Sequence, residues 1–294
     1  MHTAAARTSD WTILALIRWG SEYLNDRGFE DARLNIELLL SHILHLKRIN
    51  LYTNFDYLLT PAELAGFKAA LQRRLNHEPL QYIMGETEFM GIPLFVNSSV
   101  LIPRPETEEL VERAVDWARR RAMPEVRVLD IGTGSGNIPV AMERFLPNAY
   151  ITSIDVSREA LDVAARNVKR HDCSRIELQH LDVFGVIFED RSFDMVIANP
   201  PYVSSAEFQL LQPEVKDFEP ASATTDHADG LRIICRICDV AVKKLVPGGA
   251  LFIEVAHNQG DEARRIATGA GLADVGISRD LSGHDRILQG FRAT

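Results

Sequence analysis

The sequence predicts an α/β protein in which a seven-stranded, mostly parallel sheet follows a small helical-bundle N-terminal domain. From residue 106 onward, short apolar runs alternate with amphipathic helical stretches, which is typical of parallel strands joined by helices. A glycine-rich turn joins the first of these runs to a helix. Helical periodicity without strand signals over residues 10–85 predicts the separate bundle. The length of 294 residues allows two domains of about 150 residues each.

Residues 1–85 are expected to form the bundle. Apolar side chains recur at helical spacing over 11–24 and 34–43, and Thr60-Pro61 is typical of the start of a third helix. Residues 86–104 are expected to form a β-hairpin linker, because two short extended runs, 87–89 and 92–96, flank Gly91. Residues 105–294 then form the second domain.

The second domain begins with an amphipathic helix that ends near Arg121. Its expected strands are apolar runs, namely 126–131, 150–154, 176–181, 193–198, 250–255, 275–279 and 287–291. Helical stretches near 137–145, 157–170, 229–245 and 258–270 separate most of them. The last two runs flank a turn at Gly283-His284, so we expect them to form an antiparallel pair at the edge of the sheet.

Composition excludes several classes of protein. Hydrophobic residues make up 46% and charged residues 25% of the chain, as in ordinary globular domains. The net charge of −9 disfavours direct nucleic-acid binding. Cys235 and Cys238 have the spacing of half a zinc site, but no second pair follows, so we expect no metal. The three cysteines fit a reducing compartment, and no run approaches the roughly 18 apolar residues of a membrane span. These features predict a cytoplasmic protein without membrane contact.

The glycine-rich turn and the strand after it predict a site for a nucleoside-containing cofactor. Glycines let the backbone bend tightly and let a ligand approach. Asp155, at the end of the next strand, can accept hydrogen bonds from both ribose hydroxyls. The alternative is a purely structural turn. The expected cofactor contacts are the turn and the strand ends beside it, namely Asp130, Gly132, Thr133, Gly134, Ser135, Gly136, Asp155, Asp182, Val183 and Asn199.

The segment Asn199-Pro200-Pro201-Tyr202 follows the fourth expected strand, at the edge of the sheet where α/β proteins bind ligands. The Asn199 side-chain oxygen and the Pro200 carbonyl can each accept one hydrogen of a planar NH₂ group, and Tyr202 can stack on it. When such a nitrogen is held beside an electrophilic methyl group, the reaction is faster because the two atoms are correctly oriented and at a high effective concentration. The alternative is a β-turn that is stiffened by proline.

With these motifs the chain resembles the class I S-adenosylmethionine-dependent methyltransferases, which have a Rossmann-like sheet. Within them it resembles the bacterial peptide-chain release-factor glutamine methyltransferases. The resemblance covers nearly the whole chain. Besides the cofactor turn, Asp155 and Asn199 to Tyr202, it rests on Arg73-Arg74, Glu78 to Gly85, Glu88-Phe89, Ile102-Pro-Arg-Pro-Glu-Thr-Glu108 and Asp280 to Arg286.

The resemblance implies a reaction and its participants. S-adenosyl-L-methionine would donate a methyl group to the side-chain nitrogen (N5) of the glutamine in the Gly-Gly-Gln motif of release factors, leaving S-adenosyl-L-homocysteine. Asn199, Pro200 and Tyr202 are the expected catalytic residues. Pro201, Phe89 and Glu106 join them as expected substrate contacts, and the helical domain is expected to dock the release factor.

Three alternatives differ in substrate or activity. They are glutamine methylation of a ribosomal protein, N6 methylation of DNA adenine, and a cofactor-binding scaffold without activity. The segment 103–108 favours release factors over ribosomal proteins, and the acidic chain disfavours DNA. The chain departs from the family pattern at Ala256 and His257, where glycine and an aromatic residue are usual, and at Val183, where an aromatic is common.

Overall fold

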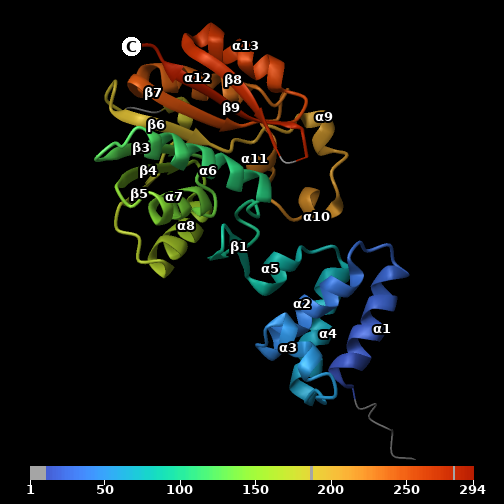
Figure 1. Cartoon of the computed structure of the whole chain (residues 1–294). Helices are drawn as coiled ribbons and strands as arrows, with labels where there is room; N and C mark the ends of the chain where they lie inside the picture. The colour runs from blue at the N-terminus through green and yellow to red at the C-terminus, as the bar shows by residue number, and fades with distance from the viewer. Residues whose placement is uncertain (1–10, 186–187, 281) are drawn as a thin grey trace, which may run out of the picture. The chain divides into compact units, whose positions relative to one another are not determined.

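The computed structural model describes residues 11–185, 188–280 and 282–294 (Figure 1). Residues 1–10 of the expected bundle and Leu281 of the C-terminal motif lie outside the described residues. The chain divides into two compact units, Met1–Met84 and Gly85–Thr294. The predicted hairpin is part of the second unit, in which the sheet also lies.

The first unit is helical. Its core is formed by apolar side chains that repeat at helical spacing, such as Leu16, Ile36 and Phe67, each at most 1% exposed. The third predicted helix begins at Thr60, whose hydroxyl accepts from the Glu63 amide while the Glu63 carboxylate accepts from the Thr60 amide. The helices are α1 (Ile13–Asn25), α2 (Ala32–Leu44), α3 (Arg48–Thr53), α4 (Pro61–Leu75) and α5 (Leu80–Met84).

The second unit contains a two-stranded hairpin and a seven-stranded sheet of order β5-β4-β3-β6-β7-β9-β8. Strands β3 to β7 run parallel, whereas β9 pairs antiparallel with both β7 and β8. The predicted sheet and its antiparallel pair are therefore confirmed. The strands are β1 (Glu86–Phe89), β2 (Ile92–Phe95), β3 (Val126–Ile131), β4 (Ala149–Asp155), β5 (Ile176–His180), β6 (Phe193–Ala198), β7 (Leu245–Glu254), β8 (Leu272–Arg279) and β9 (Asp285–Arg292).

Helices cover both faces of the sheet because successive strand side chains point to opposite sides. Val128 packs with the helices before and after β3, and its neighbour Leu129 packs with Ile234 and Ile237 on the other face. Figure 1 shows the two helical layers. The first layer contains α6 (Pro105–Arg120), α7 (Asn137–Phe145) and α8 (Arg158–Arg170), and the second contains α12 (Arg232–Lys244) and α13 (Gly260–Ala270).

Between β6 and α12 the chain forms three helices that the periodicity did not predict. Each has four residues, which is too short for a repeating apolar stripe. They are α9 (Ser205–Phe208), α10 (Pro213–Lys216) and α11 (Ala221–Thr224), and a 3₁₀ turn, η1 (Val183–Gly185), follows β5.

Asn167 on α8 forms hydrogen bonds with both the hairpin and the glycine-rich turn. Its side chain is 0% exposed and makes three hydrogen bonds. The amide nitrogen donates to the carbonyls of Phe95 (2.9 Å) and Ser135 (2.8 Å), and the amide oxygen accepts from the Phe95 amide (2.7 Å). A single buried residue thus connects two segments of the pocket described below. Within the described residues, no helix is long and apolar enough to cross a membrane.

Candidate active site

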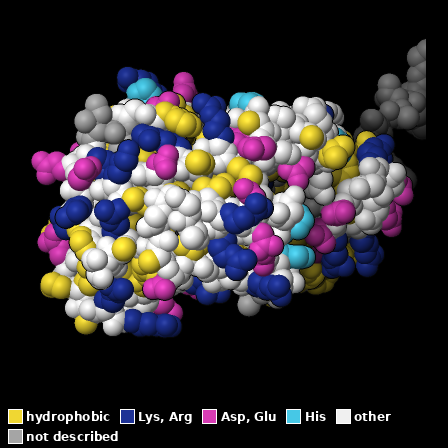
Figure 2. All heavy atoms as spheres, turned by 90° about the horizontal axis from the view of Figure 1, so that it is seen from above, with side chains coloured by type: hydrophobic (Ala, Val, Ile, Leu, Met, Phe, Trp, Pro, Cys, Tyr) yellow, Lys and Arg dark blue, Asp and Glu magenta, His cyan; other side chains and the backbone are white. Residues whose placement is uncertain are grey.

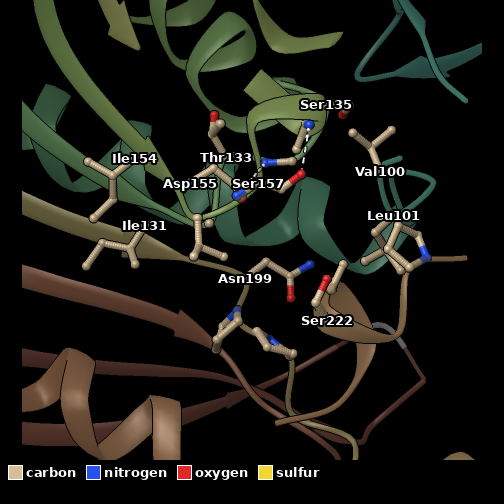
Figure 3. Close-up of a pocket in the computed structure, with 18 of the residues that line it drawn as sticks. Val100, Leu101, Ile131, Thr133, Ser135, Ile154, Asp155, Ser157, Asn199 and Ser222 are labelled. Atoms are coloured by element: carbon tan, nitrogen blue, oxygen red, sulfur yellow. Dashed lines mark hydrogen bonds between the residues drawn. The ribbon is translucent and has the colours of Figure 1, made fainter. Parts of the chain in front are cut away.

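A pocket of about 340 Å³ opens at the carboxyl ends of β3, β4 and β6 (Figure 3). The glycine-rich turn and Asp155 form one side. Segments that include Leu101 and Ser222 form the other, and Asn199 lies between them. Of the residues predicted from the sequence, the pocket is lined by Gly132, Thr133, Gly134, Ser135, Asp155, Asp182, Val183, Asn199, Pro200 and Pro201.

The turn after β3 needs its glycines for different reasons. Gly132 and Gly134 have φ angles of +81° and +52°, which L side chains rarely adopt. Gly136 does not line the pocket. A Cβ atom there would lie 3.2 Å from Ala164, so this glycine allows α8 to pack closely against the turn.

Asp155 holds the turn in place with its carboxylate. One oxygen accepts from the Gly134 amide and the other from the Ser157 amide, each at 2.9 Å. Each carboxylate oxygen can accept a further hydrogen bond from a ligand hydroxyl. Burial raises the pKa of Asp155, and the backbone amides oppose that shift because they stabilise the charged form.

The next wall of the pocket is apolar, with an acidic residue beside it. Val183 and Phe184 both line the pocket, and the Asp182 carboxylate accepts from the Phe184 amide at 2.9 Å. The Arg232 guanidinium lies 4.7 Å from the centre of the Phe184 ring. Phe184 therefore supplies an aromatic surface next to Val183, where the chain departs from the family pattern.

The loop after β6 presents acceptors to the pocket. The Asn199 side-chain nitrogen donates to the Thr107 hydroxyl at 3.0 Å. None of the described residues donates a hydrogen bond to the Asn199 side-chain oxygen or to the Pro200 carbonyl. Both acceptors are therefore free to bind the hydrogens of a ligand.

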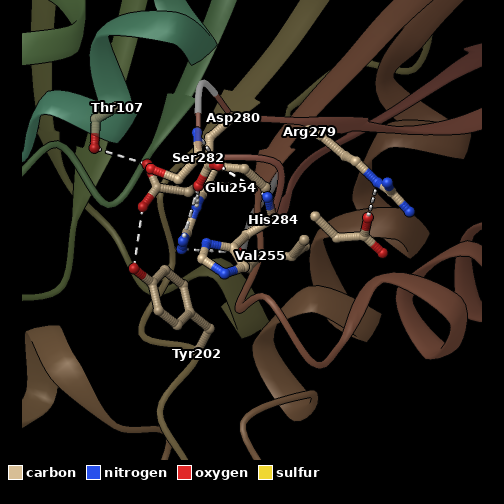
Figure 4. Close-up of polar contacts among 10 residues, drawn as sticks. Thr107, Tyr202, Glu254, Val255, Arg279, Asp280, Ser282 and His284 are labelled. Carbon is tan, nitrogen blue, oxygen red and sulfur yellow. Dashed lines mark hydrogen bonds and ion pairs between the residues drawn. The ribbon is translucent and has the colours of Figure 1, made fainter.

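Behind this loop lies a buried polar cluster around Glu254, which is 0% exposed (Figure 4). One Glu254 oxygen accepts from the Thr107 hydroxyl at 2.7 Å, and the other accepts from the Tyr202 hydroxyl at 3.1 Å. Burial raises the pKa of Glu254, whereas these two hydrogen bonds and the charge of Arg286 lower it. Burial, together with the Glu254 carboxylate, also raises the pKa of Tyr202.

Several predicted contacts do not line the pocket. Asp130 is 0% exposed beneath the turn, and burial raises its pKa to about 7. Phe89, 1% exposed, packs in the core with Leu94 and Leu110 instead of forming a wall of the site. The Tyr202 hydroxyl donates a hydrogen bond to Glu254, and Tyr202 does not line the pocket. Glu106 lies on the first turn of α6, outside the pocket. Their predicted roles in direct contact therefore gain no support from this geometry.

Pro103 and Arg104 belong to the segment 102–108 that carries the resemblance, whereas the other pocket residues were not singled out from the sequence. The walls opposite the turn consist mainly of small or apolar side chains, and Arg104 donates from one nitrogen to both Glu219 oxygens at 2.9 and 2.7 Å. Gln259 supports the loop from behind, because its side-chain nitrogen donates to the Tyr202 carbonyl at 2.9 Å. Gln259 closes the segment 254–259, which also contains the two departures from the family pattern at Ala256 and His257, and this segment was the signal for the support. The remaining lining residues include Ser98, Ser99, Val100, Leu101, Pro103, Pro220, Ser222 and Ala223.

The altered position Ala256 is compatible with this arrangement. Only its backbone is used, since its amide donates to the Gln259 side-chain oxygen at 3.1 Å. Ala256 has no positive φ, so the usual glycine is not needed there. His257 instead packs against the His284 ring, at 5.8 Å between centroids.

The described part of the chain contains no group of three or more His, Cys, Asp or Glu side chains that could hold a metal ion. Cys238 is buried in α12, whereas Cys235 is exposed. Figure 2 shows basic and acidic side chains interspersed over one face, and the described residues there form no continuous basic stripe.

Comparisons with known proteins identify the family and the fold of the chain. A family model described as "PrmC N-terminal domain" matches residues 15–85, and one described as "Methyltransferase small domain" matches residues 118–214. A crystal structure of a methyltransferase from Pyrococcus furiosus has a TM-score of 0.51 and 17% identity, covering 70% of this chain and 91% of that one. It shows a shared fold.

Curated relatives show the family. A protein from Geobacter sulfurreducens named release factor glutamine methyltransferase is 41% identical over 283 residues, which are 95% of this chain and 96% of that protein. A protein of the same name from Rhodopirellula baltica is 38% identical over 282 residues, covering 95% of each. The resemblance found in the sequence is thus confirmed, and the chain belongs to the release factor glutamine methyltransferase family.

Proposed function

We propose that this protein transfers a methyl group from S-adenosyl-L-methionine to the side-chain nitrogen of the glutamine in the Gly-Gly-Gln motif of peptide-chain release factors. The observation that carries the proposal is the orientation of Asn199. Its amide nitrogen is held by Thr107, and its oxygen is left free at the pocket, next to the Pro200 carbonyl. The names of the curated relatives supply the substrate.

The residues of the pocket fit this cofactor by their chemistry. Asp155 has lone pairs for the ribose hydroxyls, and Val183 and Phe184 provide an apolar wall for the adenine, with Asp182 beside them. The glycines of the turn leave space for the methionine part. When bound, S-adenosylmethionine supplies a methyl carbon on a sulfonium, which is an electrophile. We include Asp130 only as a buried support beneath the turn.

The chain then has to orient a weak nucleophile. The lone pair of an amide nitrogen is shared with its carbonyl, so the nitrogen reacts only when it is held close and correctly aimed. In the proposed step the Asn199 oxygen and the Pro200 carbonyl accept the two N–H hydrogens. As the nitrogen–carbon bond forms and the carbon–sulfur bond breaks, these fixed dipoles stabilise the developing positive charge on nitrogen. The nitrogen releases one proton afterwards, so the step needs no buried base.

The shape of the pocket suits a narrow peptide. Small and apolar residues, including Ser99, Pro103 and Ser222, line the side opposite the cofactor turn. A glutamine preceded by two glycines brings no bulky neighbours to such walls. We propose that Glu106, which is partly exposed on the first turn of α6, contacts the substrate outside the pocket. We also propose that Phe89 supports the hairpin from the core and that the helical domain docks the release factor.

The test is a methylation assay with purified release factor and S-adenosylmethionine, followed by mass spectrometry of the peptide that contains Gly-Gly-Gln. The expected result is one added methyl group on that glutamine. Ribosomal proteins and adenine-containing DNA serve as competing substrates in the same mixture. Methyl transfer to either of these in preference to the release factor would refute the proposal. Because release factors work in translation, we also place the reaction in the cytoplasm.

A further inference from the structure

Three side chains from distant parts of the sequence form a continuous chain of hydrogen bonds that ends at the pocket. Glu254 is at the end of β7, Thr107 is on the first turns of α6, and Asn199 follows β6. The Thr107 hydroxyl donates to Glu254 at 2.7 Å, and the Asn199 side-chain nitrogen donates to the Thr107 oxygen at 3.0 Å. Glu254 and Thr107 are 0% and 1% exposed, so water does not compete for these bonds.

The number of protons shared in this series of hydrogen bonds determines whether the Asn199 side chain turns its oxygen or its NH₂ group toward Thr107. A threonine hydroxyl has one proton, and a charged carboxylate can only accept. Thr107 therefore gives its proton to Glu254 and has only lone pairs left for Asn199. The group of Asn199 that faces Thr107 must then be the NH₂ group, which leaves the oxygen on the side of the pocket.

We propose that Glu254 and Thr107 are positioning residues, which fix the polarity of the Asn199 amide so that it presents an acceptor and not a donor to the substrate nitrogen. This inference rests on the function proposed above. A neutral Glu254 that carries its proton on the oxygen facing Thr107 reverses these hydrogen bonds. Its own proton is then donated to Thr107, Thr107 donates to Asn199, and the amide turns its NH₂ group toward the substrate NH₂ group, which it cannot bind.

Burial is the largest influence on the pKa of Glu254 and raises it, whereas the groups around the carboxylate favour its charged form, with one exception. The Tyr202 hydroxyl donates to the second oxygen, and the positive charge of Arg286 on β9 acts on the carboxylate. Asp280 holds Arg286 through two contacts of 3.2 Å. Glu106 on α6 is the opposing charge. The C-terminal motif thus has a physical part in the site, since Asp280 and Arg286 support the carboxylate that orients Asn199.

The experiment compares two variants, each of which disrupts a different member of this series of hydrogen bonds. Glu254→Gln is nearly isosteric, and its NH₂ group can donate to Thr107 and reverse the chain. Thr107→Val removes the hydroxyl and keeps the shape. For each variant we expect kcat to fall at least about tenfold, the equivalent of one hydrogen bond, and at most as far as in Asn199→Ala, while the KM for the release factor and the affinity for S-adenosylmethionine stay near wild type.

Two matched controls accompany them. Thr107→Ser keeps the hydroxyl and is expected to keep kcat. Glu112→Gln removes a charge from the exposed side of the same helix and is also expected to leave kcat unchanged. Thermal unfolding of each variant shows whether the fold is intact. Loss of cofactor affinity together with kcat in both test variants would overturn the proposal, because it would mean a general structural role.

Repeating both substitutions in an Asn199→Ala variant shows whether Glu254 and Thr107 act by positioning Asn199 or by a general structural role. Without the amide there is nothing to orient, so Glu254→Gln and Thr107→Val are expected to cause little further loss of kcat in that background. An undiminished further loss would overturn the proposal. The pH profile gives a second readout. In the wild type, kcat falls as the pH decreases through the pKa of Glu254, which burial raises, and Thr107→Val is expected to lose this dependence.

Failure of the positioning role can be distinguished from failure of the proposed function. The wild-type protein is first assayed on the release factor. If it methylates no glutamine there, the proposed function fails before any variant is compared. If it does methylate the glutamine and Glu254→Gln retains full kcat at neutral pH, only the positioning role is overturned.

Discussion

Replacement of Asn199 by alanine is the sharpest test of the catalytic geometry. The change removes the free side-chain oxygen at the pocket and leaves the Thr107 hydroxyl bonded to Glu254 at 2.7 Å, so the polar cluster keeps its main contact. Loss of one fixed dipole that stabilises a transition state costs roughly 10²–10³ in kcat. The cofactor contacts of Asp155 and the glycine-rich turn remain in place.

The expected result is therefore a kcat lowered by roughly 10²–10³, with the affinity for S-adenosylmethionine changed by less than about threefold. Single-turnover methylation of a release factor measures the first quantity, and calorimetric titration with the cofactor measures the second. Asn258→Ala is a matched control, because Asn258 is exposed and donates to the exposed Glu207 at 3.1 Å. Equal losses of turnover and cofactor affinity would refute the assignment of Asn199 as the acceptor of the substrate amide.

Four further predictions concern the pocket and its supports. Asp155→Ala is expected to weaken cofactor binding about 10- to 100-fold, since hydrogen bonds to a charged group are lost; unchanged affinity in a calorimetric titration would contradict this. Asn167→Ala removes three buried hydrogen bonds and is expected to lower the free energy of unfolding by about 3 kcal/mol in urea, whereas a loss below about 1 kcal/mol would show that the bonds contribute little. Gly230→Ala places a Cβ atom 2.1 Å from the Tyr202 carbonyl at a φ of +82°, so we expect a lower melting temperature and lower kcat together; a variant with wild-type values would contradict the packing. Burial raises the pKa of Asp130 from 3.8 to about 7, so the unfolded chain releases this proton first as the pH rises. The contribution of Asp130 to stability should therefore decrease between pH 4 and 7 and level off above it, and Asp130→Asn should abolish that slope in unfolding measurements.

The sequence predicted the elements of the sheet well because their signal is local. A buried strand such as β6 consists mostly of consecutive apolar residues, and the glycines at 132 and 134 directly after a strand indicate a tight turn. The four-residue helices α9 to α11 carry no such repeat, so they were missed.

Direct contacts were harder to predict because they depend on the order of the strands. Thr107 and Glu254 are 147 residues apart, and they meet because α6 packs against β7. Phe89 was expected in the substrate slot from its place in a motif, but its alternation in β1 turns it into the core. A motif therefore identifies which residues take part, whereas the packing decides whether each one touches the ligand or supports a neighbour.

Strand β9 lies between β7 and β8 although it comes last in the chain. During synthesis, both of its neighbours are finished before it exists. Until residues 285–292 are made, β7 has one edge of unpaired backbone groups and β8 has two. Arg286, which supports the Glu254 carboxylate, arrives in the same step. The addition of β9 therefore completes both the sheet and the support of the catalytic loop. A nascent or prematurely terminated chain that lacks β9 has an incomplete site and exposes strand edges that promote aggregation.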